Sequence, residues 1–259
     1  MNAKTSKLRD LALSVVSILC LISLWLVLSS SRPDFFPTPQ MTWERFIELI
    51  EYPVSKVSIL GHIWASLRRV VIAFCYAVVL GISLGIAMGW NKKIRAAVEP
   101  IFESLRPIPP IAWIPLVILW FGVGEFPKIL LVFIGSFIPI VLNTMTGVAL
   151  VDPMYLSVSR VFKANTLQTM IHVVLPASIP AIFAGMKASL SSGWMVVVAA
   201  EMIASKSGVG FLITRGSESY DVALILCGMI LIGIVGALLG VVLTLLERWL
   251  CPWTTKKEK

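Results

Sequence analysis

The chain of 259 residues is 58% hydrophobic and only 14% charged, whereas soluble globular domains are about 45–50% apolar and about 25% charged. A soluble fold could not bury that much apolar surface, and the mean hydropathy of +0.90 agrees. This composition excludes disordered, collagen-like and disulfide-scaffold proteins and argues against a soluble enzyme. The net charge of +8 does not indicate nucleic-acid binding, because the charges lie between apolar runs. The sequence therefore predicts an all-α integral membrane protein surrounded by lipid.

Six stretches are long and apolar enough to cross a bilayer, which takes roughly 20 residues. The predicted spans are residues 11–30, 70–90, 107–124, 129–151, 178–204 and 222–246. The first is too long for a typical signal-peptide core and lacks a small-residue cleavage site, so it is predicted to be an uncleaved anchor. The chain is expected to form a single transmembrane domain over residues 1–259.

The orientation of the spans follows from the Lys and Arg residues of the connecting segments. With the N-terminus inside, the inner segments carry 13 of these residues and the outer segments carry 6. Cytoplasmic loops are enriched in Lys and Arg. Both termini are therefore predicted to be cytoplasmic.

Proline and glycine mark the irregular places. Four prolines between residues 107 and 115 predict a break at the start of the third span, buried against protein rather than lipid. Gly81, Gly85 and Gly89 recur at four-residue spacing in the second span, and Gly236 and Gly240 do so in the sixth. Small residues at that spacing predict close packing between helices.

Motifs for catalysis and for cofactor binding are missing from the sequence. It has no Gly-rich loop ending in Gly-Lys-Ser/Thr, no HExxH and no GxSxG, and its four cysteines show no metal-ligand spacing. His62 and His172 fall at predicted span ends and are interpreted as interfacial or loop residues. No catalytic residue, metal site or cofactor site is predicted on this chain.

Two ionisable residues fall inside the predicted fifth span, where charge is costly and usually functional. Lys187 lies near the inner end, where its long side chain can reach the interface. Glu201 lies near the outer end. It either lines a solute path or braces a turn through hydrogen bonds to backbone amides, and the sequence leaves both alternatives open.

The longest predicted inner loop, residues 152–177, has two apolar helical faces. The first comprises Tyr155, Val158, Val161 and Phe162, and the second Leu167, Met170, Ile171 and Val174. This pattern predicts two short amphipathic helices joined near Lys163–Asn165. They form either a surface connector or a docking surface for a soluble partner. The lack of any internal energy source favours docking.

Several ordered segments resemble the permease subunits of ABC importers, in the family that takes up taurine, alkanesulfonates and nitrate. These segments are FFPTP at 35–39, HIWASLRRVVIAFCYAVVLGISLGIAMG, RPIPPIAWIPLVILWFGVGEFPKI and VVLPASIPAIFAGMKASLSSGWMVVVAAEMIASKSGVGFLI. The third looks closest to the taurine and sulfonate members. The resemblance covers nearly the whole chain and implies the type I importer permease fold with six transmembrane helices.

The resemblance also implies partners and a location. The expected assembly contains a second copy of this chain, two cytoplasmic ATPase subunits that hold ATP and Mg, and an extracytoplasmic solute-binding protein. It sits in the bacterial inner membrane. Taurine or another organic sulfonate is the first candidate solute, with nitrate, bicarbonate or a thiamine precursor as alternatives. A secondary carrier would predict inverted repeats and midplane ionisable residues, and a membrane enzyme would need clustered His, Asp or Glu. Neither pattern is visible.

The family's docking signature runs Glu-Ala-Ala, three residues, Gly, nine residues, Ile-x-Leu-Pro. Aligned on Leu175–Pro176, the sequence fits the tail but has Ser157–Ser159 at the Glu-Ala-Ala positions and Lys163 at the glycine. The turn is expected to shift to Asn165, a residue type that tolerates the left-handed conformation. The docking residues that the resemblance implies are Ser157, Val158, Ser159, Val161, Phe162, Lys163, Ala164, Asn165, Leu175 and Pro176.

The fifth span also suggests a translocation path. At 100° per residue, Ser189, Ser192 and Val196 fall on one face and offer an anionic solute hydrogen-bond donors without a fixed charge. The alternative is that these serines only pack between helices. The predicted path residues are Asn143 on an opposite wall, Ser189, Ser192, Trp194, Val196 and Glu201.

Overall fold

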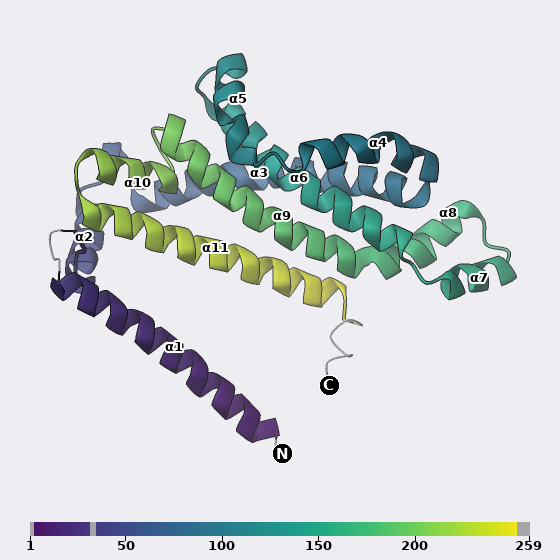
Figure 1. Cartoon of the computed structure of the whole chain (residues 1–259), viewed down its shortest axis with the longest axis horizontal. Coiled ribbons are helices and arrows are strands. Elements are labelled where there is room, and N and C mark those ends of the chain that lie inside the picture. Colours follow the sequence, from purple (N-terminus) through teal and green to yellow (C-terminus); the bar gives the residue numbers. More distant parts are fainter. Residues whose placement is uncertain (1–2, 32–34, 253–259) are drawn as a thin grey trace. The chain divides into compact units, whose positions relative to one another are not determined.

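The computed structural model describes residues 3–31 and 35–252, and within them the chain forms helices and turns without a strand. The predicted all-α fold is confirmed. The α-helices are α1 (Ala3–Ser31), α2 (Pro39–Glu51), α3 (Ile59–Trp90), α4 (Lys92–Leu105), α5 (Ile114–Phe121), α6 (Glu125–Ala149), α7 (Pro153–Val161), α8 (Thr166–Thr169), α9 (Leu175–Ala204), α10 (Val209–Glu218) and α11 (Val222–Leu250). Shorter helical turns are η1 (Val54–Lys56), η2 (Pro110–Trp113) and the π-helical η3 (Met170–Val174) (Figure 1).

Several helices begin where a side chain accepts a hydrogen bond from the first turn. Thr38 caps α2 through a bond from the Met41 amide, and Asn91 caps α4 through a bond from the Lys93 amide. α2 also has a proline in its first turn, where no amide donor is needed. The helix starts therefore follow local sequence chemistry.

Within the described part of the chain, five helices are long and apolar enough to cross a membrane: α1, α3, α6, α9 with the helical turns before it, and α11. The predicted third span, residues 107–124, has a different form. Residues Lys92–Leu105 and Pro110–Phe121 form a pair of helices bent by 84°, which makes a sixth span if the pair counts as one. α5 alone has 8 residues and reaches only about 12 Å. Pro107 and Pro109 at the break are exposed, so the expected burial against protein is not met within this chain.

Part of the charge count falls on residues that the structure does not describe. Arg32, Lys256, Lys257 and Lys259 lie outside the described residues. The cytoplasmic location of the two termini stays a prediction.

The chain divides into two compact units. The first comprises Met1–Ile59 and Leu212–Ile230. Within it, Arg45 Nε donates to Asp221 Oδ2 over 2.7 Å and joins α2 to the turn before α11. Burial works against the charge of Arg45, but the hydrogen bond and charge of Asp221 outweigh it and raise the pKa of the guanidinium. The Cys227 thiol donates to the Thr42 carbonyl and adds a second link between these elements.

The second unit comprises Leu60–Phe211 and Leu231–Lys259, and α6 contacts both α3 and α9 within it. The glycines of α3 face α6, as predicted: a Cβ added at Gly81 would meet Ile140, and one added at Gly89 would meet Val148. Gly185 of α9 lies equally close to α6, against Asn143. Small residues therefore let three helices approach closely.

Gly85 gives a direct test of this packing. An added Cβ would lie 2.6 Å from Thr144 Cβ and 2.8 Å from the Val141 carbonyl oxygen. Gly85→Ala should therefore lower the thermal midpoint of the detergent-solubilised protein by the equivalent of about 1–3 kcal/mol, because a packed interface must open. Size-exclusion chromatography after stepwise heating measures this midpoint.

The matched control is Gly240→Ala, since no atom lies within 4 Å of a Cβ at Gly240. The packing prediction is not met at this glycine. Alanine is favoured over glycine inside a helix by about 1 kcal/mol, so this variant should keep or raise the midpoint. Equal behaviour of the two variants would contradict the packing account of Gly85.

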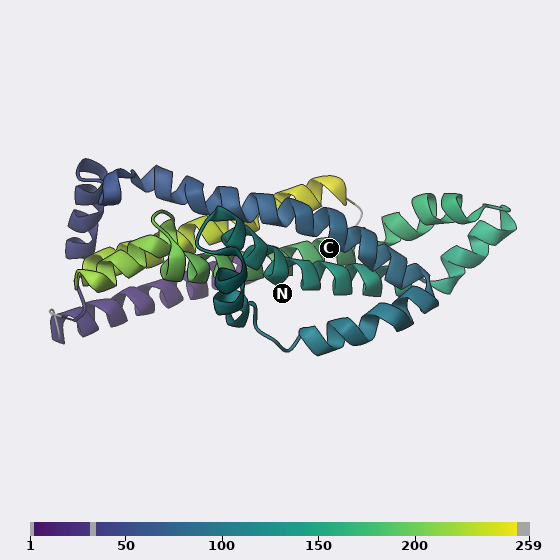
Figure 2. The ribbon, with the colours of Figure 1, turned by 90° about the horizontal axis from the view of Figure 1, so that it is seen from above.

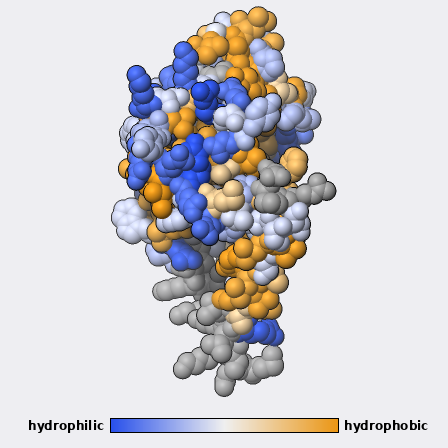
Figure 3. Space-filling view, turned by 90° about the vertical axis from the view of Figure 1, so that its left-hand side faces the viewer, coloured by the Kyte–Doolittle hydropathy of each residue, from blue (hydrophilic) through white to orange (hydrophobic). Residues whose placement is uncertain are grey.

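Large apolar side chains are exposed along much of the molecule. Leu60 is 76% exposed on α3 and Leu119 is 80% exposed on α5. On the face drawn in Figure 3, hydrophilic residues gather together while apolar residues stay exposed beside them. Extensive exposed apolar surface is expected where lipid, rather than water, surrounds the helices.

Candidate functional site: a helical hairpin, a cavity and a buried ion-pair network

Residues 152–174 form a helical hairpin that projects beyond the ends of α6 and α9 in both ribbon views (Figures 1 and 2). Asp152 caps α7 by accepting a bond from the Met154 amide. Asn165 and Gln168 form a reciprocal capping box that starts α8. The predicted two short helices joined near Lys163–Asn165 are therefore present. The second arm runs through η3 directly into α9. This arm and the predicted fifth span therefore form one continuous helical stretch, Thr166–Ile203.

The turn of the hairpin sits at the glycine position of the family signature. Lys163 has φ 53°, its amide donates to the Arg160 carbonyl, and the Ala164 amide donates to the Ser159 carbonyl. These bonds define a Schellman helix end, in which the left-handed residue follows the cap. The predicted shift of the turn to Asn165 is wrong, because Asn165 has φ −74° and caps the next helix.

Lys163→Gly should stabilise this turn, because a left-handed L-residue is strained by roughly 1–2 kcal/mol. Part of that gain is lost to the greater freedom of glycine in the open chain. In this variant we expect hydrogen exchange of the amides at positions 163 and 164 to slow by about two- to fivefold. This factor corresponds to a net gain in the stability of the turn of about 0.5–1 kcal/mol. Ala164→Gly is the control and should speed exchange. Faster exchange in Lys163→Gly would contradict the strain.

An open groove of about 690 Å³ runs between the two arms of the hairpin. Tyr155, Val158 and Phe162 line it from α7, and His172 and Pro176 line it from the other arm. Phe162 is 81% exposed. The first predicted apolar face is thus open to a partner.

The second predicted face of the loop is split. Leu167 and Ile171 are exposed, but Val174 is fully buried and Met170 packs against it. Buried Ser159 and Thr169 join the arms through a hydroxyl–hydroxyl bond of 3.4 Å. Met170 and Val174 of this face therefore pack inward, in an apolar cluster that also includes Leu156 of α7.

The remaining docking residues take different positions. Ser157 is exposed and donates to the Pro153 carbonyl, and Leu175 is half-buried. Val161 is 81% exposed at the end of α7. The hairpin thus presents the signature segment mostly to the outside, with Ser159 as the buried exception.

A cavity of about 540 Å³ lies among α4, η2, α6 and α9. Asn143 of α6 and Ser192 of α9 both line it, so the structure brings together two of the predicted path residues. The walls are otherwise mainly apolar and aromatic, including Trp113, Phe133 and Phe137.

The other predicted path residues of α9 lie away from this cavity. Ser189 is buried, its carbonyl accepts a bond from Ser136 of α6, and its hydroxyl has no partner among the described residues. Val196 is buried beside Gly135 of α6. Trp194 turns to α11 and donates to the Ile232 carbonyl over 3.1 Å. Because α9 is flanked by α6 and α11, only Ser192 of the predicted face reaches open space.

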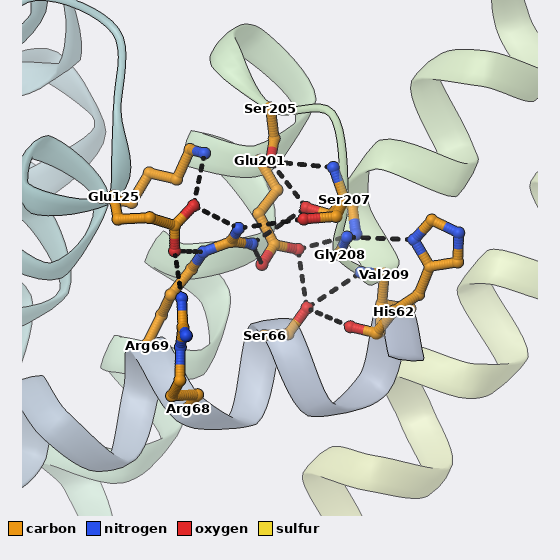
Figure 4. A network of polar contacts seen from close by, with 12 residues as sticks. His62, Ser66, Arg68, Arg69, Glu125, Glu201, Ser205, Ser207, Gly208 and Val209 are labelled. Carbon is orange, nitrogen blue, oxygen red and sulfur yellow. Dashed lines mark hydrogen bonds and ion pairs between the residues drawn. The ribbon is translucent and has the colours of Figure 1, made fainter. Parts of the chain in front are cut away.

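Glu201 belongs to a buried network of charged and polar groups (Figure 4). Its carboxylate accepts from Arg69 Nη1 at 2.6 Å, from Ser66 Oγ at 2.8 Å and from the Gly210 amide at 3.0 Å. Glu201 is 1% exposed. These contacts match the bracing alternative, since Glu201 faces protein donors rather than open space.

Arg69 is the centre of the network and is itself 1% exposed. It forms two further bonds to Glu125 at the start of α6, of 2.8 and 2.7 Å, and one to the Ser207 carbonyl. Lys128 also reaches Glu125, over 3.3 Å. One guanidinium therefore ties α3 to α6, to α9 and to the segment that follows α9.

Sequence reasoning missed most of this network. His62, Ser66 and Arg69 are spaced by four and three residues, which puts them on one helical face and could have revealed the cluster. His62 is not a loop residue: it lies in the first turn of α3, is 1% exposed, and its Nδ1 accepts from the Gly208 amide. Lys187 pairs with Glu247 of α11, and its predicted reach to the membrane interface stays a prediction.

The described residues contain no group of three or more His, Cys, Asp or Glu side chains that could hold a metal ion. The fold and these sites define a multi-helix membrane protein with an exposed helical hairpin, a partly open cavity and a buried ionic brace.

Comparison with known proteins gives the class. Residues 77–256 match the family of binding-protein-dependent transport system inner membrane components, and the chain belongs to this family. It is 34% identical over 249 residues to the taurine transport system permease protein TauC of Escherichia coli (strain K12), covering 95% of this chain and 90% of that protein. It is 36% identical to the nitrate import permease protein NrtB of Synechocystis sp., covering 92% of this chain and 88% of the relative.

Solved structures agree on the fold. A structure of the MetNI methionine ABC transporter in an inward-facing conformation aligns with a TM-score of 0.66 at 17% identity, over 74% of this chain and 95% of the other. The chain is therefore an ABC importer permease subunit of the type I fold in the bacterial inner membrane. It is a transporter component and not an enzyme.

Proposed function

We propose that this chain forms the membrane path of an ATP-driven importer for a small anion or zwitterion, with taurine or another organic sulfonate as the first candidate. The observation that carries this proposal is the 34% identity to the E. coli taurine permease over 95% of the chain. The nitrate permease relative at 36% identity makes nitrate the second candidate. Bicarbonate and a thiamine precursor follow as further alternatives.

The proposed assembly contains two copies of this chain. Two ATPase subunits, which carry ATP and Mg, dock on the 152–177 hairpins, and a solute-binding protein delivers solute to the opposite face. The exposed groove between the hairpin arms supports this docking surface, because an amphipathic groove can accept an apolar segment of a partner. No cofactor is proposed on the permease itself.

Force from the ATPase is proposed to travel along one helical rod. The second hairpin arm continues through η3 into α9, and α9 carries Ser192 at the cavity and Glu201 at the brace. A displacement of the hairpin would therefore move α9 relative to α6. In this account Asn143 and Ser192 line the path, whereas Ser189, Trp194 and Val196 pack between helices and Glu201 braces the end of α9.

A competition experiment tests the solute. Cells that produce the permease with its ATPase and binding protein would take up radiolabelled taurine, and unlabelled taurine, methanesulfonate, nitrate or bicarbonate would compete. We expect taurine and methanesulfonate to compete best. Absence of taurine uptake, or taurine uptake that nitrate or bicarbonate suppresses more strongly than methanesulfonate does, would overturn the sulfonate assignment.

A further inference from the structure

The cavity among α4, η2, α6 and α9 contains a cation that the path prediction did not include. Arg106, the cap residue at the end of α4, lines the cavity together with Asn143 and Ser192. The other lining residues are apolar or aromatic. A guanidinium, a side-chain amide and a hydroxyl therefore share one mainly apolar cavity.

We propose that Arg106, Asn143 and Ser192 form a transit site for the oxyanion group of the solute, a sulfonate, nitrate or bicarbonate. This inference rests on the proposed function and names the residues that recognise the solute within the path. A guanidinium presents parallel N–H groups that match two oxygens of such an anion. The serine hydroxyl and the asparagine amide add neutral donors from the facing helices.

Arg106 is only loosely engaged by protein acids. Its nearest carboxylate, Glu103 Oε1, is 3.8 Å from Nη1, and the two side chains are 62% and 59% exposed. An exposed ion pair of this length contributes little. By contrast, Arg95 on the same helix makes two bonds to Glu99, of 3.0 and 2.9 Å. Of these two arginines, Arg106 is thus the one that can exchange its partner for a solute.

The two neutral donors are also available. Asn143 uses one amide hydrogen on the Pro139 carbonyl, over 2.8 Å, which orients its amide group and leaves the second hydrogen. Ser192 is half-buried, and its hydroxyl enters none of the hydrogen bonds found among the described residues. Because Arg106 is partly exposed, water and salt weaken its attraction. A weak contact suits a path, since a tightly held solute would not leave.

Charge-selective labelling tests this transit site. The full-length chain, with its four native cysteines replaced by alanine and carrying Ser192→Cys, would be placed in lipid nanodiscs. Anionic and cationic methanethiosulfonate reagents of similar size would then compete for the thiol. A guanidinium in the same cavity should favour the anionic reagent, and Arg106→Gln should lower the anionic-to-cationic rate ratio by about fivefold.

Arg95→Gln is the matched control, because it removes the same charge from the same helix outside the cavity lining. It should leave the ratio unchanged. Arg106→Lys should also keep most of the ratio, since the charge stays. Methanesulfonate, added as a probe at millimolar concentration, should slow labelling in the Ser192→Cys protein that retains Arg106. It should slow labelling much less when Arg106→Lys is also present, because an ammonium group lacks the paired N–H donors of a guanidinium.

An unchanged rate ratio in Arg106→Gln would overturn the proposal, as would an unreactive thiol in a Ser192→Cys protein that elutes as one monodisperse peak. The outcome is independent of transport. If the complex carries none of the anions tested, the proposed function fails, but the labelling ratio still decides whether Arg106 serves the cavity. If the complex takes up solute but Arg106→Gln leaves the anionic-to-cationic rate ratio unchanged, the proposed function is supported and this transit site is refuted.

Discussion

Arg69→Met should remove most of the correctly folded protein. The substitution leaves the carboxylate of Glu201 buried without its cation, at 1% exposure. Removing one partner of a buried ion pair costs about 3–5 kcal/mol, which is a large part of a typical folding free energy. Size-exclusion chromatography of the solubilised protein should show a sharp loss of the monodisperse peak.

A double variant separates a lost brace from a merely intolerant position. In Arg69→Met with Glu201→Gln, the uncharged amide can still accept from Ser66 or from the Gly210 amide, whose bonds to Glu201 are 2.8 and 3.0 Å long. A neutralised pair is often tolerated better than a half-broken one. We expect the double variant to recover part of the peak. Recovery no better than for Arg69→Met alone would refute the pairing argument.

Phe162→Asp should uncouple ATP hydrolysis from transport while the permease still folds. Phe162 is 81% exposed at the mouth of the hairpin groove, so a charge there costs the isolated chain little. In the complex it would bury a carboxylate against the ATPase, in place of apolar area worth about 25 cal/mol per Å². Purified complexes should hydrolyse ATP without stimulation by solute-loaded binding protein, and uptake should fall at least tenfold.

Phe162→Leu is the control for this prediction, since it keeps an apolar side chain of similar reach. It should retain most of the stimulation and uptake. Normal stimulated hydrolysis and uptake in Phe162→Asp would exclude this part of the hairpin from docking.

The sequence predicted the long helices well because apolar length and glycine spacing act locally. α6 and α11 lie close to their predicted ranges, and the Gly81–Gly85–Gly89 stripe faces α6 as expected. The third span was harder. Prolines at 107, 109 and 110 indicate a break, but whether the chain continues straight or turns by 84° depends on what α4 packs against. Phe102 of α4 lies against Met88 and Val141, contacts that local sequence cannot reveal.

In the candidate sites too, features set by local sequence were predictable, whereas features set by distant contacts were not. The hairpin was predictable from its two amphipathic faces, but the position of the turn was not. Lys163 takes the left-handed conformation because two backbone bonds fix the helix end there, which outweighs its poor propensity. The Arg69–Glu201 pair joins residues 132 apart in sequence, so no local pattern links them. Arg106 was not among the predicted path residues, because its place beside Asn143 and Ser192 follows from the bend after α4.

Solute accumulation in proteoliposomes tests whether this permease is driven by a separate ATPase docked on its hairpin. Liposomes would contain the permease with or without the ATPase. ATP would be supplied on the side of the hairpin. The binding protein and radiolabelled taurine, nitrate or bicarbonate would be supplied on the opposite side. At least one solute should accumulate only when the ATPase and ATP are both present, and collapsing the ion gradients should have no effect on this accumulation. Accumulation without the ATPase, abolished when ion gradients collapse, would contradict this expectation and indicate a secondary carrier.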